Sequence, residues 1–241
     1  MPTIPDKSIN MILTDLPYGT TKCKWDIQIP FEPLWNEYKR IIKNNGVICL
    51  FGIEPFSSYL RLSNLEWYRY DWIWEKSIPS NFLNAKKMPL KIHENISIFY
   101  NKQPTYNPIK WKIDEKFIDK RKSLNPYKIK DDQQYSNMIK GNIKIRKKDD
   151  GSRFPQTIIS FNSVSGKNIH PTQKPVLLFE YLIKTYTNEG DTILDNCAGS
   201  GTTGIASYNT NRNCIMIEKE EKYCDIIKDR MNEVTKQKVL I

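Results

Sequence analysis

The feature of this 241-residue chain that most constrains its fold is a glycine-rich turn that follows an apolar strand and opens a helix. The strand, residues 192–194, ends in Asp195, and residues 199–204 have the pattern G-x-G-x-x-G. A glycine lets the backbone of such a turn approach a ligand where a Cβ atom would clash. The next apolar run, residues 214–217, ends at Glu218, whose carboxylate is placed to accept hydrogen bonds from ribose hydroxyls. The segment therefore predicts a site for a nucleoside-containing cofactor.

Apolar runs and helical spacings alternate along the rest of the chain. We predict strands at residues 9–14, 47–51, 70–74, 96–100, 192–194 and 214–217, and helices at residues 31–43, 55–62 and 202–207. A further helix starts at Pro175, where the missing N–H of proline costs nothing. This alternation is typical of an α/β fold with a parallel sheet. From residue 102 to about residue 165 the periodicity fails, which indicates an inserted segment that is partly loop.

The glycine pattern alone also fits a fold that binds a dinucleotide such as NAD. Two details disfavour NAD. The carboxylate of Asp195 beside the turn repels a pyrophosphate, whereas it can hold a cationic amino acid end. Only about 40 residues follow the turn, and a dinucleotide-binding domain needs more chain there.

Two further motifs accompany the turn. The tetrapeptide Asp15-Leu16-Pro17-Tyr18 directly follows the first predicted strand, and the hexapeptide His170-Pro-Thr-Gln-Lys-Pro175 precedes the turn. In isolation the tetrapeptide is an ordinary strand-to-loop turn. With all three motifs in this order, the chain resembles the β-type DNA amino-methyltransferases, in which the catalytic motif precedes the cofactor motif. The resemblance implies a Rossmann-like sheet of S-adenosylmethionine (AdoMet)-dependent methyltransferases, with a circularly permuted motif order and an inserted target-recognition segment.

The resemblance assigns the catalytic role to the tetrapeptide. The Asp15 carboxylate and the Leu16 carbonyl accept the two hydrogens of an exocyclic amino group and direct its lone pair at the sulfonium methyl of AdoMet. Pro17 stiffens the turn, and Tyr18 offers a face on which a flipped-out base stacks. An Asp at the first position favours N6 of adenine. N4 of cytosine stays open as the acceptor, because its chemistry is so similar and enzymes of that type more often carry Ser there.

The cofactor residues are carried over from the other two motifs. In the family the hexapeptide wraps the methionine end of AdoMet, while Asp195 and Glu218 suit the ammonium and the ribose diol. Asn196 and Cys197 stand where the family usually has Pro and Phe. The predicted cofactor contacts are Thr172, Lys174, Asp195, Cys197, Gly199, Ser200, Gly201, Thr202 and Glu218. Trp74 and His93 line the base pocket in one interpretation; in the other, Trp74 packs in the core and His93 makes a structural hydrogen bond.

The net charge of +10 is concentrated in one part of the chain. Residues 102–153 hold 15 Lys and Arg against 7 Asp and Glu, a net charge of +8, and a basic block in a near-neutral protein is typical of a polyanion partner. We therefore expect double-stranded DNA as the partner, and a homodimer stays open. The predicted division is a catalytic half (1–101), a basic target-recognition segment (102–165) and a cofactor half (166–241). The predicted DNA contacts are Lys22, Lys24, Trp25, Lys144, Arg146, Lys147 and Lys148.

Several observations bear on the compartment and on the competing classes. The N-terminus lacks the pattern of a signal peptide, no apolar run approaches the ~20 residues of a membrane span, and the five cysteines form no C-x-x-C pair. These features favour a cytoplasmic protein with reduced thiols and no metal site. Family members usually begin about 20 residues further upstream, so a DNA-binding module without catalysis stays open as an alternative.

Overall fold

The computed structural model describes residues 1–21, 23, 26–114, 150–164 and 173–239. The chain divides into two compact units. The sheet unit comprises Met1–Pro108 and Gln156–Ile241, and the insert unit comprises Ile109–Pro155. In the described part of the insert unit, β5 (Trp111–Lys112) and β6 (Ser152–Arg153) pair as an antiparallel ribbon. The division at residues 102 and 165 expected from the sequence stays a prediction.

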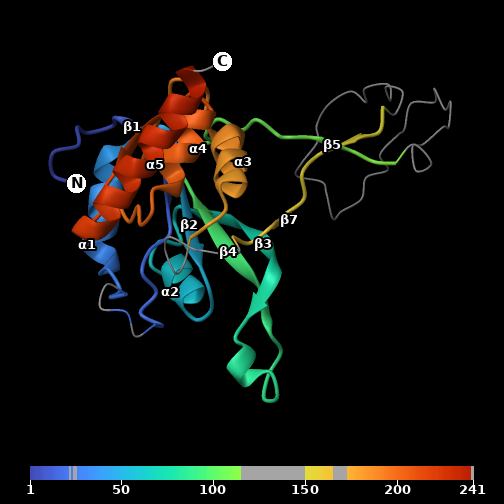
Figure 1. The fold of residues 1–241 in the computed structure, drawn as a ribbon. Coiled ribbons are helices and arrows are strands. Elements are labelled where there is room, and N and C mark those ends of the chain that lie inside the picture. The colour runs from blue at the N-terminus through green and yellow to red at the C-terminus, as the bar shows by residue number, and fades with distance from the viewer. Residues whose placement is uncertain (22, 24–25, 115–149, 165–172, 240–241) are drawn as a thin grey trace, which may run out of the picture. The chain divides into compact units, whose positions relative to one another are not determined.

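A seven-stranded sheet forms the centre of the sheet unit (Figure 1). Its strand order is β7 (Ile158–Phe161), β3 (Tyr68–Ser80), β4 (Lys91–Phe99), β2 (Ile42–Gly52), β1 (Ile9–Thr14), β8 (Thr192–Asp195) and β9 (Asn213–Met216). Strand β1 is parallel to β2 and β8, β8 is parallel to β9, and β7 is parallel to β3. The predicted α/β class is confirmed, with one difference: β4 runs antiparallel to both of its neighbours.

Helices cover both faces of the sheet, and each face buries alternate residues of the central strands. Met11 and Leu13 of β1 lie in one core cluster with α3 (Val176–Tyr186) and with Ala206 of α4 (Thr202–Asn209). Ile12 lies in the other cluster, with α1 (Phe31–Ile41) and α2 (Phe56–Leu62). The long helix α5 (Glu221–Val239) ends the described chain and contacts α4. None of the described helices is long and apolar enough to cross a membrane.

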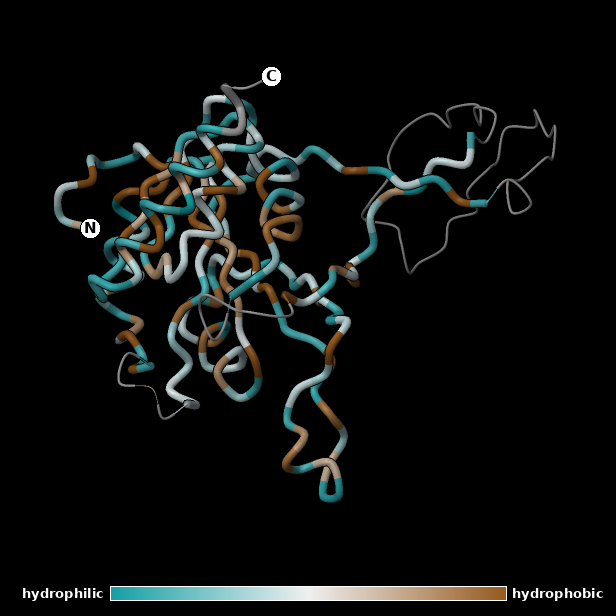
Figure 2. The backbone as a smooth tube through the Cα atoms, in the orientation of Figure 1, coloured by the Kyte–Doolittle hydropathy of each residue, from teal (hydrophilic) through white to brown (hydrophobic). Residues whose placement is uncertain are grey.

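Strands β3 and β4 continue past the sheet as a hairpin, which projects from the body of the unit (Figure 1). At its base the side chains of Trp72, Trp74, Ile96 and Ile98 are buried. A short 3-10 helix, η1 (Phe82–Asn84), lies near the tip. Figure 2 shows apolar and polar residues interspersed along this projection, and Leu83 in η1 is 100% exposed.

The structure corrects the sequence-based assignment of elements in two places. No strand was predicted at residues 158–161, where β7 pairs with Ile73–Lys76 of β3 and belongs to the sheet. Helix α5 was not predicted at all. Strands β2, β3 and β4 are also longer than the apolar runs that predicted them, since polar residues continue each strand beyond its buried part.

Candidate functional site

One cavity of about 910 Å³ opens where the parallel strands β1, β8 and β9 end. The carboxyl ends of parallel strands lie at one edge of a sheet, which is where α/β proteins bind ligands. The turn after β1, the turn after β8 and the residues after β9 all contribute to its lining, and β3, β4 and the start of α3 complete it. Segments that are about 200 residues apart in sequence, such as those of Asp15 and Glu218, therefore meet at one site within the sheet unit.

Asp15 lies directly after β1, and both of its carboxylate oxygens have donors. Lys174 Nζ donates to Asp15 Oδ2 at 2.7 Å, and the Tyr18 hydroxyl donates to Asp15 Oδ1. Burial raises the pKa of Asp15, and the nearby ammonium of Lys174 opposes that shift. The side chain of Leu16 is buried in the core, which fixes the backbone between these residues.

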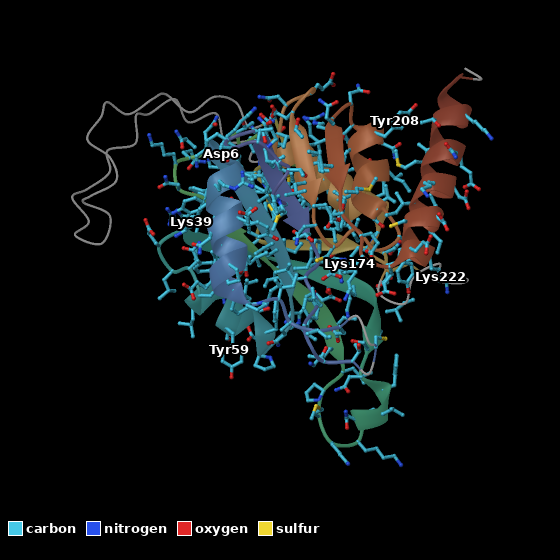
Figure 3. All side chains as sticks on the ribbon, turned by 90° about the vertical axis from the view of Figure 1, so that its left-hand side faces the viewer. Asp6, Lys39, Tyr59, Lys174, Tyr208 and Lys222 are labelled. Atoms are coloured by element: carbon cyan, nitrogen blue, oxygen red, sulfur yellow. The ribbon has the colours of Figure 1, made fainter. Side chains whose placement is uncertain are left out.

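Lys174 is the buried centre of a row of alternating charges. Its side chain is 9% exposed, and its Nζ atom lies 3.1 Å from Glu94 Oε2 as well as 2.7 Å from Asp15 Oδ2. Glu94 is in turn paired with Lys76, whose Nζ atom lies 3.3 Å from Glu94 Oε1. In Figure 3 Lys174 lies in the interior of the unit, whereas Lys39 and Lys222 lie at its periphery. The row reads Lys76, Glu94, Lys174, Asp15.

The pKa values within this row move in the directions expected for paired charges. Burial alone lowers the pKa of Lys174, but the carboxylates of Asp15 and Glu94 raise it above its ordinary value. Burial alone raises the pKa of Glu94, but the ammonium groups of Lys174 and Lys76 hold it below its ordinary value. Lys174 and Glu94 are therefore both charged near neutral pH.

The glycine-rich turn is organised around Asp195. This side chain is 3% exposed and accepts hydrogen bonds from the Thr203 hydroxyl and from the backbone N–H of Cys197. Burial raises the pKa of Asp195 to about 6, although the Thr203 hydrogen bond opposes the shift. Asp195 thus fixes the turn through these two hydrogen bonds, and its carboxylate lies next to the turn residues that line the cavity.

The two glycines of the turn serve different purposes. Gly199 (φ 51°) lines the cavity, and Gly201 (φ 80°) caps the start of α4. A Cβ atom on Gly201 meets Ile227 of α5 at 3.0 Å rather than the cavity. The left-handed backbone and the close packing against α5 both require glycine at position 201. The cofactor contact of Gly201 expected from the sequence stays a prediction.

Glu218 joins the ends of β8 and β9. Its Oε2 atom accepts the backbone N–H of Gly199 at 2.8 Å, and its Oε1 atom accepts those of Lys219 at 2.8 Å and Glu220 at 2.9 Å. A carboxylate offers about four lone-pair sites. Three of them bind backbone N–H groups, which leaves one for a ligand hydroxyl.

The loop that follows Tyr18 is held by a carboxylate that the sequence analysis did not single out. Asp26 is almost fully buried and accepts backbone N–H bonds from Gly19 at 2.8 Å, Thr20 at 2.9 Å and Thr21 at 2.6 Å. Burial alone raises the pKa of Asp26, but these hydrogen bonds and that of the Thr21 hydroxyl lower it below its ordinary value. The charged carboxylate therefore fixes the start of the loop, where Thr20 and Thr21 line the cavity.

Aromatic side chains line the catalytic side of the cavity. The Tyr18 ring packs against Phe56 of α2 with 5.0 Å between ring centroids, and Tyr18 also lines the cavity. Trp74 lines the cavity too, but it is 3% exposed and its indole N–H donates to the backbone oxygen of Phe161 at 2.9 Å. His93 is exposed at the same cavity.

Most of the site residues predicted from the sequence gather at this cavity. The lining includes Asp15, Leu16, Pro17, Tyr18, Lys174, Asp195, Cys197, Gly199, Ser200, Thr202 and Glu218. Gly201 lies just behind it. Thr172 and the predicted DNA contacts Lys22, Lys24, Trp25, Lys144, Arg146, Lys147 and Lys148 lie outside the described residues.

Sequence reasoning missed the roles of Lys76 and Glu94, although a signal was present. Alternate residues of a strand share a face, so Lys76 lies on the same face as the buried Trp74, and Glu94 on the same face as the buried Ile96. A Lys and a Glu on the buried faces of two strands indicate an ion pair, because an unpaired buried charge is costly.

The cavity fits AdoMet by the chemistry of its lining. AdoMet is a cation at its sulfonium and ammonium groups and carries a ribose diol and an adenine. The lining offers the carboxylates of Asp195 and Glu218, and apolar surface from Ile217, Ala198 and Phe179. The volume of about 910 Å³ lies within the range of roughly 300–1,000 Å³ typical of small-molecule sites. A second, polar region of the cavity around Asp15 can hold the group that receives the methyl.

Comparison with known proteins agrees with this geometry. The model of the N6/N4 methyltransferase family, described as a DNA methylase, matches residues 9–229. The type II methyltransferase M.HpaI of Haemophilus parainfluenzae is 25% identical over 95% of the chain and 70% of its own length. The type II methyltransferase M.HinfI of Haemophilus influenzae is 27% identical over 96% of the chain and 65% of its own length. The chain thus spans about two thirds of the length of these relatives.

Solved structures share the fold. The complex of M1.HpyAVI with SAM superposes with a TM-score of 0.59 at 23% identity, covering 93% of this chain and 89% of that one. The PvuII DNA methyltransferase, described as cytosine-N4-specific, gives a TM-score of 0.59 at 14% identity over 96% of this chain and 88% of that one.

Proposed function

The chain belongs to the N6/N4 DNA methylase family, and on that premise we propose that it transfers a methyl group from AdoMet to the N6 amino group of an adenine flipped out of double-stranded DNA. The observation that supports this most is the shared cavity: the Asp15–Tyr18 turn and the Asp195–Gly201 turn face one space. A donor and an acceptor of a methyl group must meet in this way for direct transfer.

The residues after β1 prepare the acceptor nitrogen. The lone pair of an exocyclic amine is delocalised into the ring, so it must be redirected before it can attack. The Asp15 carboxylate accepts one amino hydrogen and the Leu16 carbonyl accepts the other. Asp15 is already held by Lys174 and Tyr18, so its orientation is fixed before the substrate binds. Such preorganisation is the main source of transition-state stabilisation in sites of this kind.

The residues after β8 and β9 orient the cofactor. When bound, AdoMet supplies a methyl group on a sulfonium, which becomes a neutral thioether once the amino nitrogen has taken the methyl. Glu218 has an acceptor site for a ribose hydroxyl, and the buried Asp195 favours a cation at the turn. After transfer the nitrogen must lose one proton, and Asp15 is the carboxylate in contact with it. No side-chain nucleophile is needed.

Methylated nucleosides provide the direct test. The protein is incubated with AdoMet and double-stranded DNA, the DNA is digested to nucleosides, and the products are identified by mass spectrometry, with the Asp15→Ala variant as control. We expect N6-methyladenine from the wild type alone. N4-methylcytosine without N6-methyladenine would assign the protein to the cytosine-specific branch of its family.

The same samples test the non-enzyme alternative. Calorimetric titration with AdoMet measures cofactor binding independently of turnover. DNA binding without any AdoMet binding at millimolar concentration would indicate a DNA-binding module that has lost catalysis, and would contradict the proposal.

A further inference from the structure

The row of alternating charges has a property that an ordinary surface ion-pair network lacks: it ends on the acceptor residue Asp15. Lys174 Nζ bridges Asp15 Oδ2 at 2.7 Å and Glu94 Oε2 at 3.1 Å. The rings of Phe51 and Tyr18 lie beside the same ammonium, at 5.4 Å and 6.0 Å from their centroids. The ammonium therefore lies between the two carboxylates and against two aromatic rings.

From this geometry we infer that Lys174 is a positioning residue for Asp15, and that Glu94, itself held by Lys76, keeps Lys174 in place. The inference rests on the proposed amino-methyl transfer, and it gives Lys174 a role on the acceptor side of the cavity. The hexapeptide resemblance had suggested a contact with the methionine end of AdoMet instead.

The physical reason lies in what the Asp15 carboxylate must do as a hydrogen-bond acceptor. To draw a hydrogen from an amine, the Asp15 carboxylate must be ionised and must keep one orientation. Burial opposes ionisation, and a lone carboxylate rotates about its χ2 torsion. A buried ammonium fixed on its far side by Glu94 meets both needs, because it stabilises the charge and occupies Oδ2. A free lysine could instead swing toward a ligand.

The charged groups around Asp15 determine how its titration responds to each substitution. Burial and the Glu94 carboxylate raise the pKa of Asp15, whereas the Lys174 ammonium and the hydrogen bond from the Tyr18 hydroxyl lower it. Activity requires ionised Asp15, so the rate falls as pH falls through its pKa. Removing the Lys174 charge raises that pKa and moves the acidic limb of the rate profile to higher pH. Removing the Glu94 charge moves it to lower pH.

Two uncharged, near-isosteric substitutions test this pair of opposite shifts. Lys174→Met and Glu94→Gln are compared with wild type by single-turnover rate against pH, with AdoMet affinity measured by calorimetry. Lys184→Met, which removes an exposed lysine on α3, is the matched control. Losing a charge-assisted hydrogen bond costs roughly 10- to 100-fold in rate for Lys174→Met. For Glu94→Gln we expect the rate to fall only about 3- to 10-fold, because Asp15 keeps its ion pair with Lys174 in this variant.

A second set of variants keeps the inference testable if Lys174→Met does not fold. Lys174→Met leaves two buried carboxylates side by side, so the double variant Lys174→Met/Glu94→Gln removes both charges together. Lys174→Arg keeps the charge, and we expect it to keep the acidic limb within a few tenths of a pH unit of wild type. A purely structural role predicts lower thermal stability with an unshifted rate profile, and that result overturns the inference.

The remaining outcomes separate this inference from the proposed function. If Lys174→Met weakens AdoMet binding about tenfold or more while the acidic limb stays in place, Lys174 is a cofactor contact and the inference fails. The carboxyl carbon of Asp15, assigned in NMR spectra by its loss in Asp15→Asn, reports its titration without any turnover. An upward shift in Lys174→Met and a downward shift in Glu94→Gln support the inference even in a protein that methylates no DNA; unshifted titrations contradict it even in an active enzyme.

Discussion

At the residue scale, the site depends on carboxylates with distinct environments. Asp15 has a cation and a hydroxyl as partners, Asp195 has only neutral donors, and Glu218 is bound by backbone N–H groups. Each environment suits a different task. In the proposed reaction Asp15 binds the amine that receives the methyl group. Asp195 holds the glycine-rich turn, and Glu218 joins two strand ends while keeping one lone-pair site for a ligand hydroxyl.

Substitution of Asp15 tests the first of these tasks. Asp15→Ala removes an acceptor that acts mainly in the transition state, so we expect a loss on the order of 3 kcal/mol, or ~100-fold or more in single-turnover rate. The fold should persist, because Lys174 keeps its partner Glu94. AdoMet affinity, measured by calorimetry, should stay nearly unchanged. Asp225→Ala, which removes an exposed carboxylate on α5, is the control. A wild-type rate in Asp15→Ala would show that the acceptor is another group.

Asp195 predicts a pH dependence of stability. Its pKa is about 6 in the folded protein and near 3.8 when unfolded. Between these values the folded state holds the proton and the unfolded state does not, so stability falls as pH rises from about 4 to 6. The expected loss is about 3 kcal/mol from this group. Urea unfolding of wild type and Asp195→Asn at pH 4, 5, 6 and 7 measures it. A constant difference between the two proteins across that range would contradict the assignment.

At the element scale, the sequence predicted the elements whose apolar residues are buried together. Strands β1 and β8 and helices α1 and α3 were found because their core residues follow the expected periods. Helix α5 was not predicted because charged residues separate its few packed apolar residues, such as Ile227 and Met231. Strand β7 was not predicted because only Ile159 of its four residues is buried.

The site was predictable to the same extent and for a related reason. Turns that follow buried strands have fixed positions, so Asp15 and Asp195, which were predicted from separate motifs, both line one cavity. The partner of Asp15 was not predictable, because Lys174 lies about 160 residues after Asp15 and about 80 after Glu94, and only the folded sheet brings it to both carboxylates.

The start of α4 offers a test with a matched control. Gly201 and Gly190 both have left-handed backbones, at φ 80° and 82°, but a Cβ atom meets Ile227 at the first and open space at the second. Gly190→Ala should cost about 1–2 kcal/mol of stability through backbone strain alone. Gly201→Ala should cost more and should also weaken AdoMet binding about tenfold, because the turn residues 199 and 200 shift with it. Denaturant unfolding and calorimetry measure the two effects.

The comparison between the two variants is decisive for the role of Gly201. Equal stability losses with unchanged AdoMet affinity would mean that packing against α5 does not position the turn. Adding Ile227→Ala to Gly201→Ala should recover part of the affinity, since it removes the clash but leaves the backbone strain.

At the scale of the whole molecule, the charge distribution predicts that DNA affinity and chemistry lie in different parts of the chain. The segment 102–153 carries +8 of the net +10, while the cavity lies entirely in the sheet unit. Within the described part of the sheet unit, the projecting hairpin is a further basic candidate, because it carries Lys86, Lys87 and Lys91 next to exposed apolar residues. The predicted contacts Lys22 and Lys24 belong to the same unit but lie outside the described residues. The segment 102–153 and the hairpin are both candidate contacts for the DNA duplex of the proposed reaction.

Salt dependence distinguishes these two candidates. Each phosphate neutralised by Lys or Arg releases counterions, so the slope of log affinity against log salt is about −0.9 per contact. Replacing Lys144, Arg146, Lys147 and Lys148 with Gln should flatten that slope by up to about 3 to 4 units. Binding should weaken equally for all DNA sequences, because phosphate contacts carry no sequence information. AdoMet affinity should not change. An unchanged slope in this variant, together with a flattened slope in a Lys86, Lys87 and Lys91 to Gln variant, would place the DNA track along the hairpin instead.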